Sequence, residues 1–124
     1  MRKRILLLTT GGTIASTPTA EGLAPGMDGQ DLARRLPFLT DRYTVTVRDI
    51  LHLDSSNIQP EEWQVIARHV FESKADYDGI IITHGTDTMA YTASVLSFML
   101  QDIRIPVVLT GAQLPIDHPL TDAL

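Results

Sequence analysis

Short apolar runs alternate along the chain with segments whose apolar residues recur at helical spacing. Four of the runs are typical of buried strands, because they are apolar or β-branched and are bounded by turn-forming residues. These runs cover about Arg4–Thr9, Tyr43–Arg48, Gly79–Thr83 and Ile105–Thr110. The sequence therefore predicts four strands, separated by segments long enough to hold helices.

Helix signals lie in the segments between these strands. Asp28 is a typical N-cap, and we expect a short helix from it to Leu36, where Pro37 would stop it. Pro60 suits the first turn of the next helix. The apolar face of that helix is predicted to consist of Trp63, Ile66, Ala67, Val70 and Phe71. After the third strand, another helical stripe is formed by Met89, Ala93, Leu96 and Leu100.

A strand–loop–helix unit repeated in this way favours a doubly wound α/β fold. We expect a mostly parallel sheet in a three-layer, flavodoxin-like or Rossmann-like arrangement, with residues 1–124 in one domain. Asp122-Ala123-Leu124 resembles the start of a helix, which such a sheet needs to cover its last strand. We therefore expect the chain to be the N-terminal part of a longer protein, truncated before that helix. Apolar surface along the last strand should then be exposed.

Small polar residues follow each predicted strand at its carboxyl end. The first strand leads into Thr9-Thr10-Gly11-Gly12-Thr13, and the third into Thr83-His84-Gly85-Thr86-Asp87. Ser55-Ser56 follows the second strand, and Gly111-Ala112-Gln113 follows the fourth. Because the carboxyl ends of parallel strands open onto one edge, we expect these groups to share a crevice for a small polar ligand. Residues 10–27 are predicted to form a long loop of the kind that often closes over a site.

These groups have two possible interpretations, a site for a small ligand or a set of ordinary turns and helix caps. Gly11-Gly12 permits a tight turn and a close approach to a ligand, and the hydroxyl of Thr13 is a nucleophile if it is activated. Backbone amides near Thr86 suit an oxyanion or a carboxylate, whereas Asp87 either caps a helix or binds a ligand ammonium. The hydroxyls that suit the carboxylate of a small zwitterion are those of Ser55 and Ser56. Each motif by itself is also an ordinary turn or cap.

Composition narrows the classes of function. Fifteen acidic against ten basic residues give a net charge of −5, which argues against nucleic acid or an anionic membrane as a partner. The chain has no cysteine, and its four histidines stand at no ligand spacing, so we expect no metal site. His84 is expected to be a packed or turn histidine. The apolar run after Arg2-Lys3-Arg4 is too short for a signal peptide, and we expect a cytoplasmic protein.

Two segments resemble signatures of a known family. Thr9-Thr10-Gly11-Gly12-Thr13-Ile14-Ala15-Ser16 resembles the first signature of bacterial L-asparaginases, and residues 81–89 resemble the second. The distance between the two and the segments Asp54-Ser55-Ser56-Asn57 and Val108-Leu109-Thr110-Gly111-Ala112-Gln113 also fit this family. The resemblance covers the whole chain and is nearest to the cytoplasmic type I branch.

The resemblance implies hydrolysis of L-asparagine to L-aspartate and ammonia without a cofactor, in a homo-oligomer, with L-glutamine as an alternative substrate. Thr13 would be the acylated nucleophile, Thr86 the second catalytic threonine, and Asp87 the partner of the substrate's α-ammonium. The other residues that the resemblance implies are Ser55 and Ser56 for the α-carboxylate and the backbone of Ala112 for the side-chain amide.

The chain departs from the family pattern at three points. A family lysine that tunes the second threonine would lie beyond Leu124, and so would the domain that completes a neighbouring subunit's site. A lid-loop tyrosine is missing between Thr13 and Gln30. We therefore expect activity only in a full-length oligomer. The alternatives are the ammonia-releasing subunit of a tRNA-dependent amidotransferase, which shares these signatures, and a non-catalytic amino-acid-binding or folding module.

Overall fold

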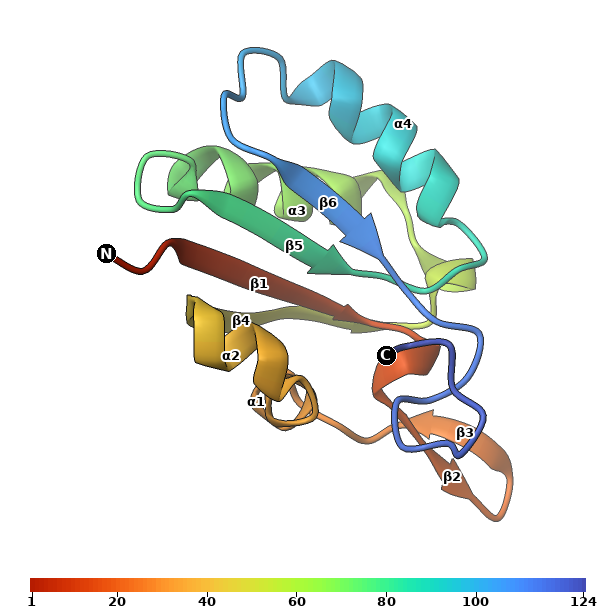
Figure 1. Cartoon of the computed structure of the whole chain (residues 1–124). Coiled ribbons are helices and arrows are strands. Elements are labelled where there is room, and N and C mark those ends of the chain that lie inside the picture. Colours follow the sequence, from red (N-terminus) through yellow and green to blue (C-terminus); the bar gives the residue numbers. More distant parts are fainter.

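The structure, a computed structural model, describes residues 1–124, apart from the side chain of Pro25. Its main element is a parallel sheet of four strands in the order β4-β1-β5-β6, with helices on both faces (Figure 1). The strands are β1 (Arg4–Gly11), β4 (Thr44–Leu53), β5 (Gly79–Thr83) and β6 (Val107–Thr110). This arrangement confirms the predicted doubly wound α/β fold.

Strand β1 lies in the interior of the sheet because it is apolar on both faces. Leu6, Leu7 and Leu8 are all almost completely buried, with exposed fractions of 0–1%. Successive side chains of a strand point to opposite faces, so a continuous apolar run needs cover on both. β1 pairs with β4 on one side and with β5 on the other, which brings the ends of three strands side by side.

Helices α3 (Pro60–Ser73) and α4 (Met89–Met99) cover one face of the sheet. A capping box between Gln59 and Glu62 begins α3, and Pro60 occupies its first turn, as predicted. Phe71 was predicted to face the core but is 56% exposed, because it lies in the last turn of α3 beyond the edge of the packed face. The core on this face consists of Leu6, Leu8, Ile66, Ala67, Val70, Tyr77, Ile80, Ile82 and Leu96.

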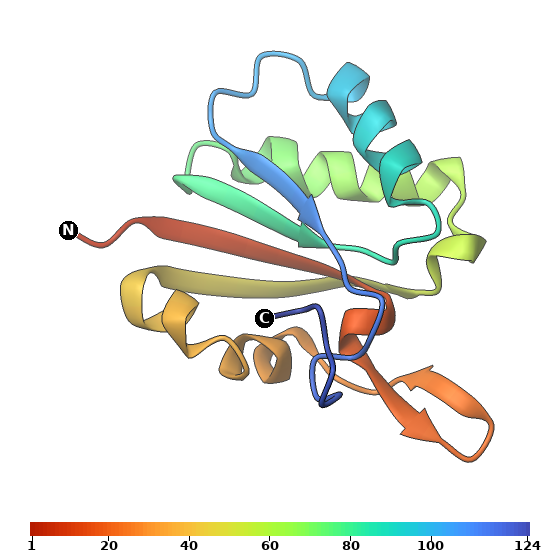
Figure 2. The same ribbon diagram turned by 45° about the vertical axis from the view of Figure 1, so that its right-hand side comes forward.

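The opposite face carries α1 (Gly29–Arg34), α2 (Pro37–Arg42) and the C-terminal segment 111–124 (Figure 2). Arg35 donates to both carboxylate oxygens of Asp117, at 2.7 and 3.0 Å, and so links the end of α1 to that segment. This hydrogen-bonded pair lowers the pKa of Asp117. A second, smaller core lies here, formed by Ile14, Ala15, Leu32, Ala112 and Ile116.

Several predicted boundaries are wrong, and β4 runs to Leu53, beyond the predicted end at Arg48. Residues 10–27, predicted to be a loop, contain a 3-10 helix η1 (Thr13–Ala15) and an antiparallel hairpin of β2 (Ser16–Thr19) and β3 (Gly22–Pro25). Pro37 does not merely end a helix. It occupies the first turn of α2, where its missing N–H costs nothing. Asp122-Ala123-Leu124 has no helical backbone, and the Asp122 carboxylate accepts hydrogen bonds from the backbone amides of residues 113 and 114. That a helix begins at these residues stays a prediction.

The face of the sheet that carries α1 and α2 is only partly covered. Val108 on β6 points to this face and is 52% exposed, which confirms the expected exposed apolar surface on the last strand. Beside it, an apolar groove is lined by Ile5, Ile81 and the ring of Tyr43. Among the helices of the described residues, none is both long and apolar enough to cross a membrane.

Candidate active site

The loops that follow β1 and β5 touch each other through their backbones. Gly12 has φ +88°, and a β-carbon placed on it would lie 2.7 Å from the backbone nitrogen of Gly85. The register Thr9↔Thr83 at the ends of the two strands brings these loops together. Glycine is needed at position 12 both for its backbone conformation and for this close approach.

A third loop, after β4, packs against the other side of Gly85. A β-carbon on Gly85 would lie only 2.6 Å from the hydroxyl oxygen of Ser55 and 2.7 Å from its β-carbon. Ser55 begins the 3-10 helix η2 (Ser55–Asn57), and its carbonyl accepts a hydrogen bond of 2.8 Å from the Thr88 hydroxyl. The loops after β1, β5 and β4 are thus held in contact by two glycines that leave no space between them.

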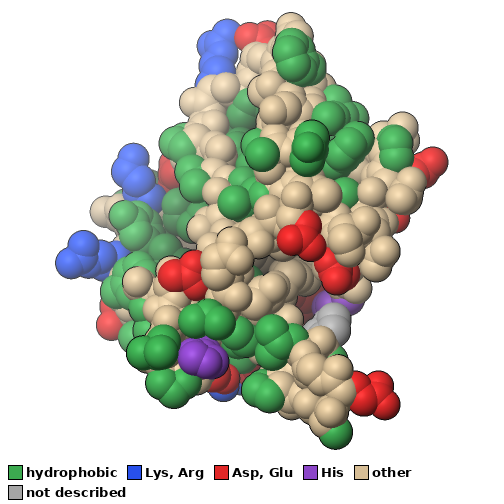
Figure 3. Space-filling model, turned by 90° about the vertical axis from the view of Figure 1, so that its right-hand side faces the viewer, with side chains coloured by type: hydrophobic (Ala, Val, Ile, Leu, Met, Phe, Trp, Pro, Cys, Tyr) green, Lys and Arg blue, Asp and Glu red, His purple; other side chains and the backbone are tan. Residues whose placement is uncertain are grey.

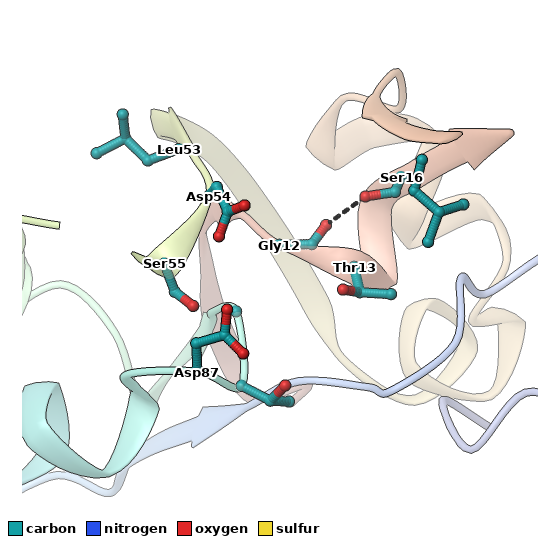
Figure 4. A pocket seen from close by; sticks show the side chains of 10 residues that line it. Gly12, Thr13, Ser16, Leu53, Asp54, Ser55 and Asp87 are labelled. Atoms are coloured by element: carbon teal, nitrogen blue, oxygen red, sulfur yellow. Dashed lines mark hydrogen bonds between the residues drawn. The ribbon is translucent and has the colours of Figure 1, made fainter. Parts of the chain in front are cut away.

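These three loops enclose a cavity of about 150 Å³. Figure 4 shows side chains from all three directed toward it, together with side chains of the β2–β3 hairpin. The residues that line it are Gly12, Thr13, Ser16, Leu23, Leu53, Asp54, Ser55, Gly85, Thr86 and Asp87. These lining residues include two carboxylates and neither lysine nor arginine, so the cavity suits a ligand with a positively charged group.

Thr13 enters the cavity from the first turn after β1. The turn is held by two hydrogen bonds to the carbonyl of Gly12, from the backbone amide of Ala15 at 3.2 Å and from the Ser16 hydroxyl at 3.0 Å. The Thr13 side chain is half-buried and points toward the side of the cavity formed by Asp87 (Figure 4). Its hydroxyl is therefore available to a ligand rather than engaged in the fold.

Asp87 faces the cavity and does not cap a helix. The N-cap of α4 is Thr88, and no side-chain hydrogen bond caps that helix. The carboxylate of Asp87 is exposed and lies opposite Ser55 in Figure 4. Of the two interpretations that the sequence leaves open, helix cap or ligand contact, the cap is wrong. Thr86 stands beside it in the same turn and is half-buried.

Two residues of the predicted site lie away from the cavity wall. Ser56 is exposed, and its backbone amide donates to Asp54 at 3.0 Å within the turn. Ala112 is 1% exposed and belongs to the second core. The loop after β6 nevertheless passes close behind the site, since a β-carbon on Gly111 would lie 2.3 Å from the carbonyl oxygen of His84.

Four side chains that line the cavity were not predicted as site residues, namely those of Ser16, Leu23, Leu53 and Asp54. Ser16 and Leu23 belong to the β2–β3 hairpin, which the sequence does not reveal because it carries proline, glycine and few apolar residues. Asp54 was predicted only as part of a loop or cap, and its carboxylate does cap η2. Asp54 directly follows β4, and strand ends line this edge, but the predicted strand ended at Arg48 and so did not reveal this position.

The electrostatic character of the whole edge agrees with that of the cavity. In Figure 3, which looks onto this edge, acidic side chains lie near the middle of the molecule, whereas Lys and Arg side chains lie toward one margin. Hydrogen bonds from the backbone amides of Gln113 and Leu114 lower the pKa of the Asp122 carboxyl.

The described residues contain no group of three or more His, Asp or Glu side chains placed to hold a metal ion.

Known proteins are similar to this chain in sequence and fold. A family model described as "Asparaginase, N-terminal" matches residues 4–124. L-asparaginase of Thermococcus kodakarensis is 51% identical over 97% of this chain and 37% of its own length, and its solved structure superposes with a TM-score of 0.87. L-asparaginase 1 of Escherichia coli is 42% identical over 98% of the chain and 37% of its own length.

A second kind of relative is a subunit of the Glutamyl-tRNA(Gln) amidotransferase of Thermoplasma acidophilum, which is 42% identical over 98% of this chain and 30% of its own length. The chain therefore spans 30–37% of the length of these curated relatives. The family model covers nearly every residue, and it includes the two strand-end loops that form the cavity. The chain belongs to the asparaginase family.

Proposed function

We propose that the protein hydrolyses the side-chain amide of L-asparagine, giving L-aspartate and ammonia. The main support for the proposal is that Thr13, Ser55, Thr86 and Asp87 all line one small cavity at the strand ends. A nucleophile, hydrogen-bond donors and an ammonium partner are what this reaction needs. The identity with the L-asparaginase of T. kodakarensis supports the same substrate.

In the proposed mechanism, Thr13 is the nucleophile. Its hydroxyl oxygen attacks the amide carbon, and the C–N bond breaks. The proton lost by the hydroxyl leaves with the amide nitrogen as ammonia. Water then cleaves the resulting ester, which returns the proton to Thr13 and releases aspartate, so that one difficult step is divided into two. Thr86, in the adjoining turn, is the proposed second catalytic threonine, and its hydroxyl and backbone amide are the proposed donors to the oxyanion.

Substrate recognition is proposed to rest on charge. Asp87 would bind the α-ammonium, and the lack of a lysine or arginine among the described lining residues leaves its carboxylate available. The Ser55 hydroxyl would bind the α-carboxylate. Ser56 and Ala112, which lie away from the cavity wall, would assist only through their backbones. A cavity of about 150 Å³ suits a ligand of amino-acid size, with L-glutamine as the alternative substrate.

Activation of Thr13 is proposed to require more than these residues. A hydroxyl is a weak nucleophile unless a base lies beside it, and the described side chains give Thr13 no titratable hydrogen-bond partner. By resemblance to the family, a lysine and a residue from a neighbouring subunit would complete the site in a homo-oligomer. The probable cytoplasmic L-asparaginase of Campylobacter jejuni has a solved structure, and its sequence is 35% identical to this chain. This similarity supports a cytoplasmic location.

A second candidate function is ammonia release for a tRNA-dependent amidotransferase. The amidotransferase relative from T. acidophilum is as similar to this chain as L-asparaginase 1 of E. coli is, since both are 42% identical to it. The two functions share the amide-hydrolysing step and the Thr13 nucleophile. They differ in the partner that receives the ammonia and in the preference for asparagine or glutamine.

The test is ammonia release from L-asparagine and from L-glutamine by the full-length protein, measured beside L-aspartate binding by calorimetry. The variants are Thr13→Ala and its matched control Thr13→Ser, which keeps the hydroxyl. Under the proposal, the chain binds L-aspartate, and any ammonia release is lost in Thr13→Ala and partly kept in Thr13→Ser. Release that persists in Thr13→Ala would exclude Thr13 as the nucleophile, and a chain that binds no aspartate would contradict the proposed substrate site.

A further inference from the structure

A buried histidine lies directly behind the cavity, and the proposed mechanism does not use it. His84 is 1% exposed and follows the last residue of β5. Both of its ring nitrogens have partners: Nδ1 lies 2.7 Å from the carbonyl oxygen of Gly85, and Nε2 lies 2.9 Å from the hydroxyl oxygen of Thr92 on α4. Thr92 is itself 0% exposed.

The direction of each hydrogen bond follows from the chemistry of the partners. A carbonyl only accepts, so Nδ1 of His84 must carry a proton and donate it to Gly85. The indole N–H of Trp63 on α3 only donates, and it reaches the Thr92 hydroxyl oxygen at 2.8 Å. The hydroxyl proton of Thr92 is then free to be donated to Nε2. Every polar group in the row from Trp63 through Thr92 and His84 to Gly85 is satisfied when Nδ1 of His84 donates and Nε2 accepts.

This row of hydrogen bonds ends on the peptide that links Gly85 to Thr86. The carbonyl of that peptide is held toward the buried ring of His84. In a trans peptide the N–H points opposite to the carbonyl, so the Thr86 amide is directed away from the ring. Gly85 has no side chain to fix its conformation, and its neighbours Gly12 and Ser55 restrain it only by contact. The hydrogen bond from His84 therefore adds a directional restraint on the rotation of this peptide.

We propose that His84, Thr92 and Trp63 act as positioning residues that fix the Gly85–Thr86 peptide, and with it Thr86 and Asp87, for the ligand in the cavity. The hydrogen bonds connect helices α3 and α4 with the loop after β5. The effect on the loop stands independently of the proposed function, and only the effect on the substrate rests on it. The role is indirect, since none of the three residues lines the cavity.

The test uses Thr92→Val, which removes the hydroxyl but keeps the shape, and Thr92→Ser, which keeps the hydroxyl. Imidazole nitrogen NMR on the 124-residue chain reports the tautomer of His84. Backbone nitrogen relaxation reports the order of Gly85 and Thr86, and calorimetry reports L-aspartate affinity. Trp63→Phe tests the far end of the row without altering Thr92.

We expect the proton on Nδ1 in the wild type. In Thr92→Val the order parameters of Gly85 and Thr86 should fall from about 0.85 toward 0.6, with the rest of β5 unchanged. Aspartate affinity should weaken about tenfold, as for the loss of one buried hydrogen bond, and Thr92→Ser should restore both properties. Trp63→Phe should give a smaller change of the same kind.

A proton on Nε2, or unchanged order parameters in Thr92→Val, would overturn the proposal. So would an equal loss in Thr92→Val and Thr92→Ser, because that result would indicate a packing effect. If the wild type binds no aspartate, the proposed function fails, and the tautomer and the order parameters still decide this proposal on their own. If the wild type binds aspartate and Thr92→Val binds it equally well, the proposed function stands and the positioning role is refuted.

Discussion

Replacing Gly12 by alanine tests the contact between the loops that follow β1 and β5. Gly12 has φ +88° and ψ 173°, a conformation that is almost confined to glycine, and alanine there costs about 1–3 kcal/mol. The new β-carbon would also lie 2.7 and 2.9 Å from backbone atoms of Gly85. Because the main chain cannot rotate away, this overlap costs about 1–3 kcal/mol more. We expect Gly12→Ala to lower the free energy of unfolding by about 2–6 kcal/mol.

The matched control is Gly22→Ala in the β2–β3 hairpin. Gly22 has φ +121°, but no atom lies within 4 Å of the position of its β-carbon. It therefore carries a conformational cost of about 1–3 kcal/mol without the overlap. Urea unfolding followed by circular dichroism gives both free energies, provided that the transition is two-state. Equal losses in the two variants would refute the reasoning, because the loops would then have room for a side chain.

Two further predictions concern hydrogen bonds near the site. Thr10→Val removes the buried bond of 2.8 Å from the Thr10 hydroxyl to the carbonyl of Thr83, and we expect a loss of about 1 kcal/mol in urea unfolding, against about 0.5 kcal/mol or less for the exposed Thr40→Val. A loss no greater than that of Thr40→Val would count against a role for this bond. The lowered pKa of Asp122 means that its carboxylate supports residues 113–114 above the usual aspartate pKa and loses this effect as pH falls through the lowered value. In an NMR titration, the amide signals of Gln113 and Leu114 should move together in that acidic step and stay fixed in Asp122→Asn, and a step at the ordinary aspartate pKa would contradict the prediction.

The strands and the long helix were predictable because their signals are strong and local. The run Leu6-Leu7-Leu8 and the helical spacing from Trp63 to Val70 are each produced by burial, which is what periodicity measures. The β2–β3 hairpin was not predictable in this way. Its strands are short and polar, and they are held by pairing with each other rather than by burial. Pro37 is ambiguous by nature, since proline both ends one helix and begins another.

The convergence of Thr13, Ser55, Thr86 and Asp87 was predictable from topology alone. All four follow parallel strands, and the carboxyl ends of such strands share one edge. What the pattern could not predict is the direction of individual side chains within a turn. Ser55 faces the cavity while Ser56, one residue later in η2, faces solvent. The choice between cap and ligand contact for Asp87 depended on where α4 begins, and helix boundaries are poorly predicted by local sequence.

The place of β1 between β4 and β5 constrains the order in which the chain can fold as it is synthesised. β1 is made first, but its second neighbour, β5, is complete only about 70 residues later. At about 5–20 residues per second, this leaves one edge of an almost wholly apolar strand unpaired for about 4–14 s. During that interval the nascent chain exposes an unpaired, apolar strand edge, which is the kind of surface that chaperones bind. The same strand that organises the finished site is therefore exposed to mispairing during synthesis.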